Sequence, residues 1–231
     1  DTSQVLYSKK LPANIDVSSG NMGIGYHFVK TDYRLNPRKG SELDITASAG
    51  IKKTSKNNDI INLKDPANPA FDFNSLYDSV KLKTYRFRIV GVANHYFPLG
   101  KRNTLKTALD FGLLQSPQNF MNELFRIGGN KILRGFDEES IFANQYAVFT
   151  AEYRYLVGIN SYFFGFSDVG FTKTKYSNTE FSNSFISGGV GLAFETKFGL
   201  LNLSYALGKR NDVKFDLRNS SKIHFGYINY F

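Results

Sequence analysis

The feature that most constrains this fold is an alternation of apolar and polar residues with period two. It recurs in segments of about ten residues that are separated by polar turn clusters. In segment 22–28, the apolar residues Met22, Ile24, Tyr26 and Phe28 alternate with small or polar ones. Successive side chains of a strand point to opposite faces, so this pattern predicts antiparallel strands with one apolar face.

Nine segments show the alternation, and we expect residues 5–7 or 15–17 to supply a tenth strand. The connections are expected to be short after Arg34, Phe97, Leu156 and Thr196, and longer after Lys53, Leu114, Phe171 and Gly208. Short and long connections would then fall on opposite ends of the sheet. The nine segments are 22–28, 43–51, 84–91, 105–113, 147–155, 162–171, 186–194, 201–207 and 223–231.

These features together are typical of an outer-membrane β-barrel with short periplasmic turns and long extracellular loops. The alternative is a soluble β-sandwich, because any half-buried antiparallel sheet alternates in the same way. Arg86 and Arg88 argue against it, since two arginines on the buried face of a strand are costly in a dry core. The longest uncharged stretch, 181–194, is too short for a transmembrane helix.

Composition excludes several classes of function. The chain has no cysteine, and its three histidines, His27, His95 and His224, do not have metal-ligand spacing. The net charge of +9 is spread along the chain without a basic helix or a clustered stripe, so we expect no nucleic-acid partner. We also expect no catalytic residues, no metal and no cofactor.

The most specific motif is the loop segment Gly128, Gly129, Asn130, Lys131, Ile132, Leu133, Arg134, Gly135 and Phe136. It resembles the plug-loop motif of the BamA/TamA superfamily, whose membrane part is the bacterial surface antigen domain. Four further segments resemble the same family in the same order, and the overall style resembles its Bacteroidetes members. They are 32–40 (D-x-R…P-x-x-G), 152–154 (E-x-R), 166–170 (F-x-D-x-G) and the closing hairpin 187–206.

Arg134 is the residue of this motif with the clearest chemistry. Alternation places Glu152 and Asp168 on the polar face of the two strands that follow the loop. An arginine can satisfy two carboxylates with its fixed fork of donors. The resemblance implies that Arg134 packs the loop against the inner wall, with Glu152 and Asp168 as partners. A simple loop anchor without a dynamic role is the other reading, and no nucleophile accompanies the two carboxylates to make them catalytic.

The end of the chain resembles the C-terminal signal of outer-membrane proteins, carried here by Gly226, Tyr227 and Phe231. Asn229 departs from that pattern, because an apolar outward residue is expected at its position.

The resemblance implies one β-barrel domain over residues 1–231, with a long plug loop folded inward. Members of the family have sixteen strands and usually periplasmic POTRA domains, whereas nine or ten strands are expected here. The resemblance then implies either the C-terminal part of such a barrel or an abbreviated member that closes a smaller barrel or pairs with another chain. The implied function is assembly of outer-membrane proteins in the bacterial outer membrane. The implied partners are the lipid bilayer, nascent outer-membrane proteins and periplasmic lipoproteins. The alternatives are a two-partner-type secretion pore, a passive channel or a soluble β-sandwich binding module.

Overall fold

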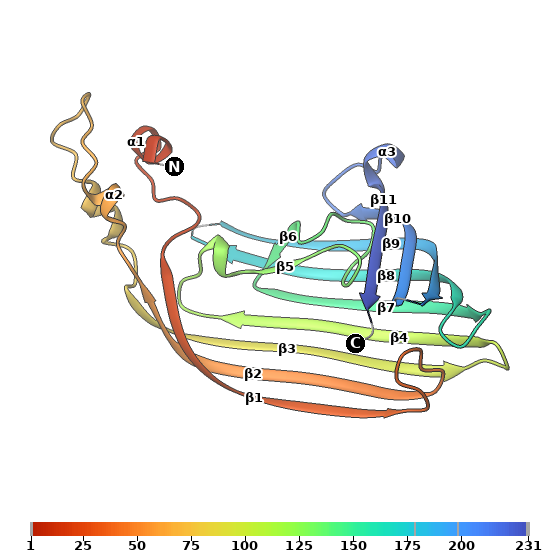
Figure 1. Ribbon diagram of the computed structural model, residues 1–231. Helices are drawn as coiled ribbons and strands as arrows, with labels where there is room; N and C mark the ends of the chain where they lie inside the picture. Colours follow the sequence, from red (N-terminus) through yellow and green to blue (C-terminus); the bar gives the residue numbers. More distant parts are fainter. Residues whose placement is uncertain (1, 178, 198, 230–231) are drawn as a thin grey trace.

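The computed structural model describes residues 2–177, 179–197 and 199–229, and most of them belong to one curved nine-stranded sheet (Figure 1). Every neighbouring pair in the sheet is antiparallel, which confirms the all-β antiparallel prediction. The sheet consists of β1 (Val17–Thr31), β2 (Gly40–Thr54), β3 (Lys83–Pro98), β4 (Asn103–Gln115), β7 (Gln145–Leu156), β8 (Tyr162–Tyr176), β9 (Thr179–Thr196), β10 (Gly199–Arg210) and β11 (Ser221–Asn229), in this order.

The strands follow one another in space as they do in the chain, so each connection joins two neighbours. We call the end of the sheet with the β1–β2, β3–β4, β7–β8 and β9–β10 connections the turn end. The opposite end, with the β2–β3, β4–β7, β8–β9 and β10–β11 connections, is the loop end. Among the described residues, β1 and β11 are the two edges of the sheet.

The outer face of the sheet carries a band of exposed apolar side chains between its two ends. In β1, for example, the side chains of Met22 and Ile24 are 85% and 77% exposed. Exposed apolar surface of this extent is unusual in a soluble monomer and typical of the lipid-facing band of a membrane barrel. No helix in the described part of the chain is long and apolar enough to cross a membrane.

The N-terminal segment forms a helix, so the prediction of a tenth strand is wrong for the described residues. Residues 5–7 lie in α1 (Thr2–Ser8), and of residues 15–17 only Val17 is in a strand, as the first residue of β1. The physical reason is packing. Val5 is buried against Ile60, Phe73 and other apolar side chains above the loop end of the sheet.

The β8–β9 connection is also shorter than predicted, because both strands continue beyond the apolar band. β8 runs to Tyr176 and β9 begins at Thr179. In the extension, Thr172 and Thr174 are buried on the inner face, whereas Lys173 and Lys175 are exposed on the outer face. Polar residues on both faces hide the strand from a search for apolar alternation.

The β2–β3 and β4–β7 connections contain short ordered elements where the sequence analysis expected only loops. The β2–β3 connection contains the helix α2 (Asn58–Ile61) and the 3₁₀ turn η1 (Phe73–Tyr77). The β4–β7 connection contains the 3₁₀ turn η2 (Met121–Glu123) and a two-stranded hairpin of β5 (Phe125–Ile127) and β6 (Ile141–Ala143). The β10–β11 connection contains the short helix α3 (Leu217–Ser220).

A buried ion pair ties the β4–β7 connection to strand β2 at the loop end. Nζ of Lys52 lies 2.9 Å from Oε2 of Glu123, and both side chains are almost fully buried. The same ammonium group donates to the carbonyl of Gln118 and lies over the ring of Phe120. Because this lysine belongs to β2 and the glutamate to η2, the pair fixes the start of the β4–β7 connection against the wall.

Candidate functional site

The β4–β7 connection, residues 116–144, is the candidate site, and we call it the inner loop. It lies on the concave side of the sheet, with the β5–β6 hairpin as its stem (Figure 1). Directly after β5, Gly128 and Gly129 have φ angles of +105° and +106°. These angles are strained for residues with a Cβ, so the pair of glycines allows the chain to leave β5 in a sharp turn.

Arg134 is the centre of the contact between the inner loop and the wall. Its Nε and Nη2 donate to the two carboxylate oxygens of Asp168 over 3.1 and 2.9 Å, and its main-chain N–H donates to the same group over 3.0 Å. Its Nη1 donates to Oε2 of Glu152 over 2.5 Å. The guanidinium stacks 3.5 Å from the ring centre of Phe166, and the Thr150 hydroxyl donates to Asp168. The loop is thereby joined to both β7 and β8.

This cluster is buried, which decides its electrostatics. The side chains of Arg134, Glu152 and Asp168 are each at most 11% exposed. Burial alone would lower the pKa of Arg134, but the hydrogen bonds and negative charges of the two carboxylates outweigh it and raise that pKa. Losing this cation would leave Asp168 without a charge partner and Glu152 with Arg154 alone.

A second arginine extends the network to the turn end. Nε of Arg154 donates to Oε1 of Glu152 over 2.9 Å, and its Nη1 donates to Oδ1 of Asn36 over 2.9 Å. The Asn36 amide in turn donates to the carbonyl of Ile159 over 3.0 Å. The Arg154 guanidinium also lies 4.8 Å from the ring centre of Tyr162. Polar contacts thus run continuously from the inner loop to the β1–β2 and β7–β8 turns.

The inner loop also reaches the last two strands of the sheet. The main-chain N–H of Gly135 donates to Nε2 of His224 in β11 over 2.9 Å. Oδ1 of Asp137 lies 2.6 Å from Nζ of Lys222 in the same strand. A Cβ at Gly135, where φ is +89°, would lie 2.9 Å from the main-chain nitrogen of Gly208 in β10. Only a glycine permits this close approach.

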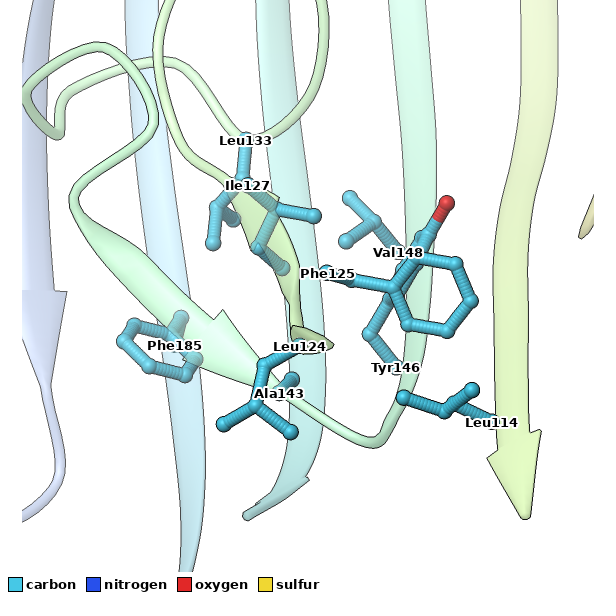
Figure 2. Close-up of a cluster of buried hydrophobic side chains, with 9 residues drawn as sticks. All are labelled: Leu114, Leu124, Phe125, Ile127, Leu133, Ala143, Tyr146, Val148 and Phe185. Atoms are coloured by element: carbon cyan, nitrogen blue, oxygen red, sulfur yellow. The ribbon is translucent and has the colours of Figure 1, made fainter. Parts of the chain in front are cut away.

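Apolar packing supports the polar contacts. Leu133 is 1% exposed and contacts the position of Gly170 in β8, where an added Cβ would lie 3.1 Å from its Cδ1. The ring of Phe136 packs edge-on against Phe185, with ring centres 5.3 Å apart. Figure 2 shows that loop and wall side chains together form one buried cluster, which consists of Leu114, Leu124, Phe125, Ile127, Leu133, Ala143, Tyr146, Val148 and Phe185.

The structure places the residues of the expected C-terminal signal in different surroundings. Gly226 lies beneath the loop, because a Cβ there would be 2.6 Å from Nδ2 of Asn130. The side chain of Tyr227 is exposed on the outer face. Phe231 lies outside the described residues.

Three residues of this network were missed by the sequence analysis as site residues. Arg154 could have been predicted from the sequence, because it belongs to the same E-x-R motif as Glu152. Asn36 and His224 had no local signal: each meets its partner across more than eighty positions of the chain. His224 was considered only as a metal ligand, and the structure instead makes it a hydrogen-bond acceptor for the loop.

The arrangement is suited to holding a loop rather than to bond chemistry. Within residues 2–177, 179–197 and 199–229, no group of three His, Cys, Asp or Glu side chains is placed to hold a metal ion. The carboxylates of the cluster are engaged by Arg134 and Arg154. The network attaches the loop to β7, β8 and β11.

Comparison with known protein families finds a match to the Omp85 superfamily domain over residues 16–228. This range includes all nine strands of the sheet up to Ile228 in β11, and the whole inner loop. A comparison with curated proteins finds no match.

Proposed function

This chain belongs to the Omp85 superfamily, whose members are outer-membrane proteins, and on that premise we propose that it assists the insertion of nascent outer-membrane proteins into the bilayer. The superfamily match indicates an outer-membrane β-barrel concerned with protein insertion or secretion. The narrower BamA/TamA-type role in assembly is our proposal, as is the bacterial outer membrane as its location. The chain would act by binding and positioning strands, without covalent catalysis.

The observation that supports this role most strongly is the attachment of the inner loop to the last strand. Gly135 is bonded to His224, and its neighbour Arg134 is bonded to Asp168 and Glu152. One short segment therefore connects β11 to the middle of the wall. A displacement of the loop would therefore remove its contacts with His224 and Lys222, and β11 would then be held by its pairing with β10.

β11 offers the surface that a substrate strand needs. It pairs with β10 on one side, and no described strand pairs with its other side. A strand edge presents main-chain donors and acceptors that an incoming strand can satisfy by β-augmentation. In lipid this pairing is favoured further, because unpaired main-chain groups cost several kcal/mol each. We propose that the inner loop holds β11 in position while a nascent strand pairs with it.

Depletion of the intact protein in the cells that produce it tests the role. We expect the folded forms of other outer-membrane proteins to decrease, as measured by their heat-modifiable gel mobility. A copy carrying Arg134→Ala, produced at the same level, should restore less of the folded fraction than the wild type. Unchanged levels of every other outer-membrane protein after depletion would contradict the proposal.

A passive channel or secretion pore is the alternative, and the polar concave face favours it. Lys106 and Asp110 are on the inner side of β4, and Arg88 is on the inner side of β3. A pore would conduct ions when the purified protein is placed in planar bilayers. High, steady conductance combined with normal outer-membrane protein levels after depletion would favour the pore over the assembly role.

A further inference from the structure

The outer face of the sheet carries its charges almost entirely at one end. Along the described strands, outward-facing charged side chains at the loop end are five lysines and one glutamate. At the turn end of the described strands, Lys30 is the one outward-facing charged side chain. The outer wall between these ends is free of charge. The loop-end set consists of Lys53, Lys83, Lys173, Lys175, Lys209 and Glu180.

Two of these lysines form an unfavourable pair. Lys53 in β2 and Lys83 in β3 are directly opposite each other in the strand register, and both side chains are exposed. Side chains at such positions have Cβ atoms about 4.5–5.5 Å apart, and like charges there destabilise a sheet. No ion pair joins either lysine to an acidic group of the described chain. The pair therefore lacks an anion.

The pair lies at the height where lipid headgroups begin. On β2 the outward residues from Leu43 to Ile51 are all apolar, and they span about 27 Å of strand at about 3.4 Å per residue. Because the strands of a membrane barrel are tilted by about 35–45°, this length covers about 20 Å of membrane thickness, which is of the same order as the apolar band of about 25 Å. Ile51 is paired with Tyr85, and one outward position beyond them come Lys53 and Lys83. An aromatic side chain followed by a cation is the arrangement expected at a membrane interface.

A second cationic place on the same rim adjoins a hollow. The hollow has a volume of about 620 Å³ and is lined by apolar residues such as Phe171 and Ala147, and by polar ones such as Lys173 and Ser182. Lys173 and Lys175 share the single carboxylate of Glu180, over 2.9 and 3.2 Å, so one positive charge is left uncompensated. The hollow is thus lined by both apolar side chains and a lysine.

We propose that the outward lysines at the loop end, above all Lys53 and Lys83, bind phosphate groups of anionic lipids in the leaflet that surrounds that end. A phosphate between the two ammonium groups turns a repulsive pair into two charge-assisted contacts. At the second place, Lys173 would hold a phosphate while the apolar side of the hollow receives part of an acyl chain. This inference rests on the outer-membrane location proposed above, but it does not depend on the role in assembly.

The test uses the intact protein, purified in dodecyl maltoside micelles, with diphosphoryl lipid A as the probe. Adding lipid A should raise the unfolding temperature, read by heat-modifiable gel mobility, by several degrees. The double variant Lys53→Gln/Lys83→Gln should lose at least half of that increase. Lys30→Gln, an outward lysine at the other end, is the matched control and should keep it. Salt at about 1 M should reduce the effect, because exposed charges are then screened beyond about 3 Å.

Two further experiments identify the source of the phosphate and allow for a variant that does not fold. Inorganic phosphate at the same concentration should not raise the unfolding temperature; an equal increase would mean a site for free anions and would overturn the proposal. An increase in the double variant as large as in the wild type would overturn it too. If the double variant does not fold, Lys173→Gln/Lys175→Gln takes its place, with the same expected loss. A lipid effect in a protein that fails the assembly assay would refute only the assembly role.

Discussion

The main-chain N–H of Gly135 donates a 2.9 Å hydrogen bond to Nε2 of His224, eighty-nine positions further along the chain. This contact joins the tip of the inner loop to the last strand of the sheet. The loop is held independently on β7 and β8 by Arg134. A segment anchored at both places constrains the edge strand at which we propose that substrates pair.

The contact of Arg134 with Asp168 gives the first prediction. Arg134→Ala should lower the free energy of unfolding by about 3–5 kcal/mol, because it leaves the buried carboxylate of Asp168 without its cation and Glu152 with Arg154 alone. Asp168→Asn in the same background should cost less than it does alone, since the two side chains interact. Urea unfolding of the four proteins in micelles measures this coupling.

Arg126→Ala is the matched control for that cycle. Arg126 belongs to the same loop, but its side chain is exposed. Its guanidinium carbon lies 5.3 Å from the ring centre of Phe142. Arg126→Ala should change the free energy of unfolding by less than about 1 kcal/mol. An equal cost for Arg126→Ala and Arg134→Ala would contradict the special role of the buried network.

His224 gives the second prediction. His224→Phe removes the acceptor of the Gly135 N–H, and leaving a buried donor unsatisfied costs about 1–3 kcal/mol. His224→Gln keeps an acceptor and should cost less. Limited proteolysis of the inner loop, followed by mass spectrometry, measures whether the tip is released. The same cleavage rate in His224→Phe and in the wild type would show that the bond does not hold the loop.

Gly135 itself gives the third prediction. Gly135→Ala would put a Cβ 2.9 Å from the nitrogen of Gly208 and 3.0 Å from the carbonyl carbon of Leu207, and its φ of +89° is strained for alanine. We expect a loss of about 1–3 kcal/mol and a displaced loop tip. Gly100→Ala is the control, with a positive φ but no atom nearer than 3.8 Å to the new Cβ. Thermal unfolding of both variants should separate them, and a larger loss for Gly100→Ala would refute the close-approach argument.

The fourth prediction concerns pH and the β1–β2 turn. Partial burial would raise the pKa of Asp32, but the main-chain N–H groups of Arg38 and Lys39, at 2.9 and 3.1 Å, outweigh it and lower that pKa. A carboxyl whose pKa is lowered by folding adds stability above its unfolded value, about 3.9, and that stability disappears as the pH falls through the folded value.

Asp32→Asn therefore should lower the unfolding temperature at pH 7, and the difference from the wild type should shrink as the pH falls below about 3.9 and passes through the lowered pKa of the folded protein. Unfolding temperatures of the two proteins measured between about pH 2 and pH 8 test this. A difference that is constant over the whole range would contradict the role of the charged carboxylate.

The sequence predicted the sheet well, because each strand that crosses the apolar band must alternate. Segments outside the apolar band need not alternate, and there the prediction from the sequence failed. The β8–β9 extension was missed because Lys173 and Lys175 are polar outward residues beyond the band. α1 was missed because Val5 is buried by tertiary packing with the β2–β3 connection, which local pattern does not reveal.

The candidate site shows the same division. The motif around Arg134 and the alternation that turns Glu152 and Asp168 inward were both visible in the sequence, and the structure brings the three side chains together. The contact with His224 depends on the curvature of the whole sheet, which carries β11 over the loop. No spacing between residues encodes that curvature.

The central claim is that the inner loop, held by Arg134, supports insertion of other outer-membrane proteins. The most direct measurement is the rate at which a urea-unfolded outer-membrane protein folds into liposomes that contain the intact wild-type protein, the Arg134→Ala variant or no protein. We expect the wild type to accelerate folding, and Arg134→Ala, inserted in equal amount, to lose most of the acceleration. Equal rates in liposomes with the wild-type protein and in empty liposomes would contradict the claim.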